Sequence, residues 1–324
     1  MPDGGARTQA VTGLQAPSAT IVRCLAGQET AMTGTRTAPQ TERPQPAESS
    51  EQTEGSEPME PGHLTTGWEP DLDLGDTLLR HYVHAYAATT LAPVAAMGGQ
   101  VLRRDEVAAA DLGSPGALLN AAVLTQPPTP DAFDATLDAV ERFYADGRGQ
   151  VFLWSPWPTP DLRARGWELE GHPPLLFRPE GTALPPGDDD LEIREVTDRR
   201  TLVDLKRVAV DGFPFEELQP FGPDDWLDER VLDLPDHHLF VGYAHGEPVV
   251  CGWSATHAGL GVLHLAAALP HARRKGYWST MLRRRLRAIG ERPVAAIFSD
   301  MSRPGAERYG FVPITRFTLW CRTR

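Results

Sequence analysis

Cysteine is scarce in this sequence, and the histidines follow no ligand pattern. The three cysteines, Cys24, Cys251 and Cys321, lie far apart, and none belongs to a CxxC pair. This spacing argues against a disulfide framework or a structural zinc site and is typical of a reducing compartment. The ten histidines are scattered without a recurring spacing, so we expect no metal site and no redox cofactor.

The sequence also lacks long apolar runs and an excess of positive charge. No stretch approaches the roughly 20 apolar residues that a membrane-spanning helix needs, and the first 31 residues lack the basic-then-apolar order of a signal peptide. We therefore expect a soluble, cytoplasmic protein that binds no membrane. The net charge is −13, from 31 basic and 44 acidic residues, which argues against a broad nucleic-acid-binding face.

Length and composition indicate two folded domains behind a disordered tail. A chain of 324 residues with 41% hydrophobic composition can bury two ordinary cores. Residues 1–66 are rich in Thr, Pro, Glu, Gly and Ser and nearly lack aromatic side chains, so they cannot bury enough apolar surface to offset the entropy of ordering. Residues 67–186 and 187–324 form the two predicted domains, joined by a Pro- and Asp-rich linker over residues 185–190.

Hydrophobic periodicity predicts mixed strands and helices in both domains. The first is expected to contain a helix from Leu78, strands over residues 118–124 and 151–154, and a helix over 133–143. The second is expected to contain strands over 191–196, 239–243, 249–253, 262–269, 294–298 and 315–321, and helices over 198–210, 276–289 and 304–309. This order predicts an α/β (α+β) fold with a mixed sheet in each domain.

An internal duplication supports the division into two domains. Six residues of the first domain recur, identical or similar in type, 144 positions later in matching structural context. The pairs are Ser155 and Ser299, Pro160 and Pro304, Gly166 and Gly310, Trp167 and Phe311, Leu175 and Leu319, and Arg178 and Arg322. We therefore expect two copies of one fold in tandem.

A basic turn between a strand and a helix carries the clearest chemical signal. The strand ends at Pro270, the turn contains Arg273, Arg274 and Lys275, and the helix begins at or near Gly276. Backbone N–H groups at a helix start lack intrahelical acceptors, and the helix dipole adds partial positive charge there. A pyrophosphate fits such a site. From the residues alone, a solvated basic turn that ends a strand is an equal alternative.

The segment resembles the acetyl-CoA motif of the Gcn5-related N-acetyltransferases (GNAT), with the pattern [Q/R]-x-x-G-x-[G/A] after a strand that ends in Val-x-Pro. Arg273, Gly276 and the spacing from Pro270 match the pattern, and Tyr309-Gly310-Phe311 resembles the family's later Gly-Phe turn. The similarity covers about 135 residues. It implies a tandem GNAT protein in which the backbone of Ala266 and Ala268 pairs with pantetheine. The implied cofactor-binding residues are Ala266, Ala268, Arg273, Arg274, Lys275, Gly276, Tyr277, Trp278 and Ser279.

The resemblance implies an N-acetyltransferase that uses acetyl-CoA as co-substrate and acetylates a primary amine by direct attack. The amine is left open as a small molecule, an aminoglycoside-like compound or a peptide amine, and the oligomeric state is open too. The alternative is a non-catalytic acyl-CoA-binding regulatory module. A third reading is a scaffold that binds no CoA.

Two residues depart from the family pattern. Trp278 stands where Gly or Ala is usual, so its indole must point away from the cofactor. Ala306 occupies the position where many members have a tyrosine that protonates the departing thiolate. Tyr309 is a second candidate for that acid, with core packing as its alternative role.

Several polar residues are candidates for the remaining chemistry. His264 on the central strand could act as a base or could be a buried structural histidine. Asp300 and Ser302 follow the next strand near the implied cleft, with helix capping as their alternative role. Glu216 and Glu217 lie in the connection that shapes the substrate pocket and could bind a cationic amine, or could form a solvated turn.

The first copy lacks the features of a phosphate site. Its corresponding turn, residues 126–132, contains three prolines, no glycine and no basic residue, and proline has no N–H to donate. We therefore expect the first domain to be a degenerate copy that braces the active one and walls its substrate cleft. Its eight arginines against sixteen acidic residues would steer a cation only weakly.

Overall fold

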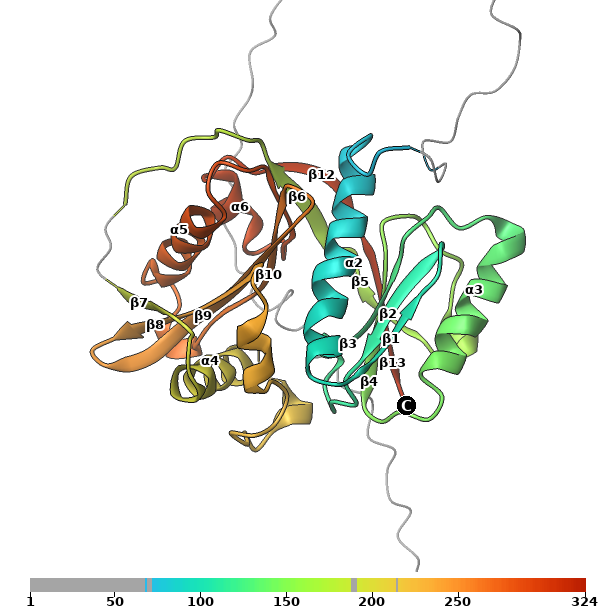
Figure 1. The fold of residues 1–324 in the computed structure, drawn as a ribbon, viewed down its shortest axis with the longest axis horizontal. Helices are drawn as coiled ribbons and strands as arrows, with labels where there is room; N and C mark the ends of the chain where they lie inside the picture. Colours follow the sequence, from blue (N-terminus) through green and yellow to red (C-terminus); the bar gives the residue numbers. More distant parts are fainter. Residues whose placement is uncertain (1–67, 69–71, 188–190, 214) are drawn as a thin grey trace, which may run out of the picture.

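The computed structural model describes residues 68, 72–187, 191–213 and 215–324, and the tail predicted over residues 1–66 lies outside them. Two mixed sheets lie side by side with helices between and around them (Figure 1). The first part of the chain contains α2 (Leu78–Ala96), β1 (Gln100–Arg103), β2 (Val107–Asp111), β3 (Asn120–Leu124), α3 (Pro130–Phe143), β4 (Gln150–Ser155), β5 (Glu168–Gly171) and β6 (Pro174–Arg178). No helix of the described residues is both long and apolar enough to cross a membrane.

The second part follows the expected order of elements. It contains β7 (Glu192–Glu195), α4 (Arg199–Gly212), β8 (His237–Ala244), β9 (Glu247–His257), β10 (Leu260–Ala268), α5 (Tyr277–Ile289), β11 (Val294–Ile297), α6 (Arg303–Glu307), β12 (Val312–Arg316) and β13 (Thr318–Thr323). The predicted α/β (α+β) class with two mixed sheets is confirmed. Strand β2 was not predicted because it is largely alanine, a residue depleted in strands. Strands β1, β5 and β6 also lie outside the predicted ranges.

The two sheets exchange their last strands. The N-terminal sheet has the order β1-β2-β3-β4-β13-β5, and the C-terminal sheet has the order β12-β6-β11-β10-β9-β8-β7. Thus β6 pairs with β11 and β12, while β13 pairs with β4 and β5. The division predicted between residues 186 and 187 is therefore wrong for the sheets, because each one contains a strand from the other part of the chain.

The single strand expected over residues 315–321 is in fact two strands that belong to different sheets. The chain changes sheets at Phe317, whose N–H donates to Pro173 O at 3.0 Å. Beside it, Arg316 Nη1 donates to His172 O at 2.7 Å. Residues 172 and 316 are 144 positions apart, so the equivalent links of the two copies cross next to each other. A local hydrophobic pattern carries no information about which sheet a strand joins.

One hydrophobic core extends across both halves. Tyr82 and Leu91 of α2 belong to the same buried cluster as Val208 of α4, Trp253 of β9 and Val262 of β10. Helix α2 thus covers a face of the N-terminal sheet and also packs on β9 and β10. Helix α5 packs on the opposite face of the C-terminal sheet from α4, where Met281 contacts the cluster of Phe240 and Val250. Figure 1 shows α2 upright between the two sheets.

Replacing Phe317 tests whether the crossing holds both halves together. Phe317 has no exposed surface, and its ring meets Tyr82 edge-on at 5.9 Å. We expect Phe317→Ala to lower the free energy of unfolding by about 3–5 kcal/mol, in one cooperative transition measured by urea denaturation. The control Val312→Ala, at a side chain that is 47% exposed, should change it by less than about 0.5 kcal/mol. Two separate transitions, with one unaffected, would contradict a shared core.

Candidate functional site

The turn before α5 presents a row of unpaired backbone donors. A short 3₁₀ turn over Pro270–Ala272 follows β10, and the backbone then reaches positive φ twice, at Arg274 (63°) and Gly276 (82°). Glycine accepts this conformation at no steric cost, whereas arginine does not. Within the described part of the chain, no N–H group of residues 274–279 has a hydrogen-bond acceptor; the first is that of Thr280, which donates to Gly276 O. Such a concave row of N–H groups binds anions.

The three basic side chains of this turn point to different surroundings. Arg273 donates to Gly212 O at 2.8 Å and to Ala268 O at 3.3 Å, so it ties the end of β10 to the end of α4. Arg274 is exposed and has no partner among the described residues. Lys275 lines a second cavity of about 590 Å³ on the other side of the turn. The cluster expected around one anion is thus divided, with Arg274 as its free charge.

Strands β10 and β11 separate as they approach the turn. They pair in parallel only at Gly261 with Val294 and at Val262 with Ala295. Beyond these residues β10 continues along β9 alone, with Ala266 opposite Gly252. The edge of β10 that includes Ala266 and Ala268 faces a cavity of about 720 Å³, as the resemblance implied.

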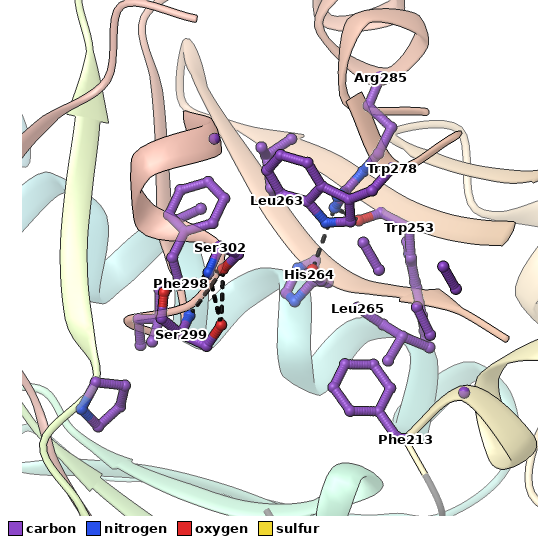
Figure 2. A pocket seen from close by; sticks show the side chains of 18 of the residues that line it. Phe213, Trp253, Leu263, His264, Leu265, Trp278, Arg285, Phe298, Ser299 and Ser302 are labelled. Carbon is purple, nitrogen blue, oxygen red and sulfur yellow. Dashed lines mark hydrogen bonds between the residues drawn. The ribbon is translucent and has the colours of Figure 1, made fainter. Parts of the chain in front are cut away.

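This cavity runs from the turn to the junction of the two halves. Its walls at one end are the turn, the end of β11 and α6, and at the other end α2, β4 and the segment after α4. Figure 2 shows His264 in the cavity wall between Ser299 on one side and Trp253, Leu265 and Phe213 on the other. Residues of the N-terminal half thus form one wall of the cavity, as expected for the first domain.

Trp278 packs beside the cleft. Its indole lies against α6, where a Cβ added to Gly305 would come within 2.8 Å of the ring, and it meets Phe298 at 6.4 Å. It is partly buried and still lines the cavity. The bulk of Trp278 is thus accommodated by a glycine on α6, and the cavity stays open beside it.

His264 lies on β10 and is neutral. Its Nε2 is 2.9 Å from Thr89 Oγ1 of α2, and that hydroxyl donates to Ala85 O at 2.8 Å. Because the threonine has one proton, His264 Nε2 is the donor of the pair and its Nδ1 carries the lone pair. Burial, with smaller effects of His237 and Arg285, lowers the pKa of His264 to about 3. His264 is therefore a hydrogen-bond acceptor at Nδ1 and a weak base.

A β-bulge on β10 aims His264 at α2. The pairing with β9 shifts between Leu263 and Ala266, so that His264 and Leu265 lie opposite Trp253 alone. Arg285 of α5 donates to the carbonyls of Trp253 and His264, the latter at 3.2 Å. Arg285 is 2% exposed, and its burial lowers its pKa to about 9. This buried guanidinium thus holds the bulge through backbone oxygens and has no carboxylate partner among the described residues.

Two catalytic candidates from the sequence lie outside the cavity. Asp300 forms a bidentate pair with Arg316, at 2.6 and 3.0 Å, which holds the pKa of its carboxyl below the usual value. Tyr309 is buried, and its hydroxyl donates to Ser279 O at 3.0 Å. Neither lines the cavity. The structure thus places Asp300 in an ion pair and Tyr309 in a packing position, and the roles of base and acid remain predictions for these two residues.

Ser302 lines the cavity but is committed to the turn before α6. Its Oγ accepts from Ser299 N at 3.1 Å, and Ser299 Oγ accepts from Ser302 N at 3.1 Å. The two hydroxyls are 2.9 Å apart. This reciprocal pair fixes the turn, which agrees with the local structural role given as the alternative, and it leaves Ser299 and Ser302 as the hydroxyls nearest to α6 in the cavity wall.

The acidic residues proposed for the substrate pocket do not line it. Glu216 is exposed and Glu217 is partly buried on a short 3₁₀ turn, whereas the neighbouring Phe213 and Phe215 line the cavity. The structure does not bring the two glutamates to this cavity, so their cation-binding role remains a prediction. Aromatic residues of the same segment occupy the wall because the apolar side chains turn inward from the loop.

Several lining residues carried no signal in the sequence. Tyr86 and Thr89 lie on α2, in the other half of the protein, and Trp154 lies on β4. Arg285 belongs to a basic helical run that reads as a solvated face, and Arg308 follows α6. They could not be found from local patterns, because they reach the cavity only through the packing of α2 and α5 on the sheet.

The corresponding turn of the N-terminal half differs from the basic turn. Helix α3 begins with proline at its first position and has Asp131 in its first turn. Proline lacks an N–H donor, and a carboxylate at a helix N-terminus opposes the binding of an anion. The geometry supports the interpretation of this half as the degenerate copy.

His237 and His264 stack with ring centroids 6.4 Å apart, and both are neutral. Their neutral state predicts that the fold loses stability in acid. Burial lowers the pKa of His237 to about 4 and that of His264 to about 3, while both titrate near 6.5 in the unfolded chain. As the pH falls below about 6.5, the unfolded state takes up protons first. The free energy of unfolding should therefore fall by up to about 1.4 kcal/mol per pH unit for each histidine. Urea denaturation between pH 7 and 5 measures how steeply the free energy of unfolding changes with pH. This dependence should be weaker for His264→Gln than for wild type or the exposed control His271→Gln. Equal dependences would contradict a neutral, buried His264.

Comparisons with protein-family models and with curated proteins give no match, but solved structures are similar. A GCN5-related N-acetyltransferase from Kribbella flavida has 16% identity and a TM-score of 0.52, over 73% of this chain and 95% of that chain. A functionally unknown conserved protein from Staphylococcus epidermidis has 16% identity and a TM-score of 0.49, over 70% and 95%. A GCN5-related N-acetyltransferase from Sphaerobacter thermophilus has 16% identity and a TM-score of 0.43, over 69% of this chain and 76% of that chain. Since similarity at this identity concerns architecture, the chain has the fold of the GCN5-related N-acetyltransferases.

Proposed function

We propose that the protein is an N-acetyltransferase that transfers the acetyl group of acetyl-CoA to a primary amine. The observation that carries the proposal is the row of unpaired N–H groups over residues 274–279, since five of these six residues line the same cavity as the free edge of β10. Six orphan donors at a helix start match the pyrophosphate of CoA. The unpaired edge of β10 matches the amides of pantetheine, which would add as a further strand.

The reaction that this arrangement supports is direct acyl transfer. Acetyl-CoA supplies an acetyl group activated as a thioester. The amine nitrogen forms a bond to the acyl carbon, the carbon–sulfur bond breaks, sulfur leaves with the electron pair, and the nitrogen loses a proton. The protein aligns the reactants in the space where β10 and β11 separate, and a backbone N–H of the β10 edge would polarise the acyl carbonyl.

The described residues that line the cavity include no strong base and no evident acid for proton transfer. His264 offers the lone pair of Nδ1 to the N–H of an attacking amine, which orients the nitrogen without removing a proton first. Ala306 is buried and has no acidic proton, and the hydroxyl of Tyr309 is committed to Ser279 O. Water in the open part of the cavity would then protonate the thiolate, with the hydroxyls of Ser299 and Ser302 in the adjacent wall.

A matched pair of variants at Tyr277 tests the backbone site. Tyr277 is the first residue of α5, where proline keeps the helix but also disfavours the ψ of −13° at Gly276, so the proline variant alters the turn as well as its donors. Tyr277→Pro removes one of the six N–H groups, and Tyr277→Ala removes the same side chain but keeps that donor. In calorimetric titration with acetyl-CoA, Tyr277→Pro should bind about ten-fold more weakly than Tyr277→Ala, with equal helix content by circular dichroism. Equal affinities of the two variants would place the pyrophosphate elsewhere.

Arg274 tests the charge of the site separately from its backbone. Arg274→Gly removes the free guanidinium and relieves the positive φ, which costs a non-glycine residue about 1–2 kcal/mol. We expect acetyl-CoA affinity to fall by about five-fold, with a weaker dependence on salt, while the melting temperature rises. Arg148→Gly, at an exposed turn far from the cavity, removes the same charge and should leave affinity unchanged. If both variants bound acetyl-CoA more weakly, the loss would be explained by the net charge of the protein and not by a charge at the site.

Turnover decides between an enzyme and an acyl-CoA-binding module. Release of the CoA thiol in the presence of a library of primary amines should exceed release without amine, and the N-acetyl product should appear in equal amount by mass spectrometry. Tight acetyl-CoA binding without any acetylated amine would instead favour the regulatory module.

A further inference from the structure

The part of the cavity farthest from the basic turn is an aromatic chamber formed by both halves. We call it the acceptor chamber and define it by Tyr86, Thr89, Leu118, Trp154, Trp253 and His264. The first four come from the N-terminal half and the last two from the C-terminal sheet. Tyr86 stacks on His264 at 5.7 Å and meets Trp154 edge-on at 6.1 Å. The chamber adjoins the place where β10 and β11 separate, so its occupant lies next to the acyl group.

No carboxylate of the described residues lines this cavity. Among the described residues that line it, none is aspartate or glutamate, whereas Arg273, Arg274, Arg285 and Arg308 do line it. Sites for polyamines and other polycations need acidic side chains, since a buried ammonium without a counter-charge is strongly unfavourable. The acidic excess of the protein therefore lies outside the cavity and gives a bound cation no partner inside it.

A fixed positive charge lies in the cavity wall beside the chamber, bonded to the carbonyls of Trp253 and His264. Arg285 is 2% exposed, lines the cavity and donates only to backbone carbonyls, with Nε unpartnered. No anion neutralises it within the described residues, so it repels a second cation nearby. The same environment lowers the pKa of His264 and of His237, which is the response expected of any basic nitrogen placed there. The aromatic rings attract cations, but the guanidinium of Arg285 is bound to the backbone oxygens of Trp253 and His264 beside them.

The polar groups of the chamber suit a neutral amine. The relay from His264 Nε2 to Thr89 Oγ1 and on to Ala85 O leaves the lone pair at His264 Nδ1. Nδ1 has no partner among the described residues. An uncharged primary amine can donate one N–H to this lone pair and still present its own lone pair to the acyl carbon. An ammonium has no lone pair and would first need a stronger base than this histidine.

We propose that the acceptor chamber binds an uncharged aromatic amine, so that the substrate is an arylamine, or an arylalkylamine bound as its free base, and not a polyamine. This inference rests on the transferase function proposed above. The flat rings of Tyr86, Trp154 and Trp253 form the walls, and His264 orients the nitrogen. An acyl chain in place of the amine would leave His264 Nδ1 without a hydrogen bond, so the chamber is assigned to the acceptor.

Amines that differ in charge at pH 7 test this assignment with acetyl-CoA held at saturation. An aniline-type arylamine should have a kcat/KM at least about ten-fold higher than an aliphatic polyamine. For a benzylamine-type substrate, kcat/KM should rise about ten-fold per pH unit below the pKa of the amine itself, because only the free base binds. A preference for the polyamine, or a kcat/KM for the benzylamine-type substrate that does not change with pH, would overturn the proposal.

A designed carboxylate provides the matched variant. Leu118 is partly buried in the chamber wall. Leu118→Glu should lower kcat/KM for the arylamine and raise the relative kcat/KM for the cationic amines, whereas the uncharged control Leu118→Gln should keep the wild-type order of preference. Equal preferences in the two variants would show that the chamber does not receive the amine, and the proposal would be wrong.

Equilibrium binding separates this inference from the proposed function. If acetyl-CoA binds but no amine is acetylated, the proposed transferase function is wrong. Calorimetric titration of the acetyl-CoA complex with the arylamine then shows whether the chamber binds an arylamine. Binding that Leu118→Glu weakens at least about five-fold more than Leu118→Gln would support the chamber even then. Absence of arylamine binding would overturn it. If polyamines are acetylated efficiently, the transferase function stands and the proposed substrate class falls.

Discussion

The exchange of the last strands is the constraint on which the rest of this structure depends. Because β6 completes the C-terminal sheet and β13 completes the N-terminal one, neither sheet is whole without the other half. The crossing at Phe317 and Pro173 fixes the two sheets side by side, and α2 is then buried against both. Helix α2 of the N-terminal half thereby becomes a wall of the cavity beside the C-terminal sheet.

The cleft forms where strands β10 and β11 stop pairing with each other. Strands β10 and β11 share two residue pairs and then diverge, which leaves backbone groups of β10 free where the cavity forms. The bulge at His264 and Leu265 turns one side chain toward α2, and the buried Arg285 stabilises that irregular backbone through two carbonyls. Unpaired backbone donors at the exposed start of α5 and the unpaired edge of β10 are both available to a ligand. Their alignment along one cavity is the physical basis for assigning a ligand there.

The chemistry of the cavity is that of a low-polarity site with backbone donors. Among the described residues that line it, the charged ones are arginines, the one histidine is held neutral, and the far end is aromatic. Such a site gains from excluding water and from holding uncharged reactants close together, and it has little need of a strong base. The carboxylate of Asp300 and the hydroxyl of Tyr309 are instead committed to an ion pair with Arg316 and to a bond with Ser279 O.

The sequence by itself determined the elements, the duplication and the turn. Apolar periodicity located most helices and strands to within a few residues, and the 144-residue repeat is a property of the chain that needs no coordinates. The turn with Arg274 and Gly276 was found because strand end, basic residues and glycine are adjacent in sequence. Tertiary structure alone decided that residues 318–323 join the other sheet and that Tyr86 and Thr89 face His264. It also decided that Glu216 and Glu217 stay outside the cavity. The reason is that side-chain periodicity records which face of an element is buried and not the partner that buries it.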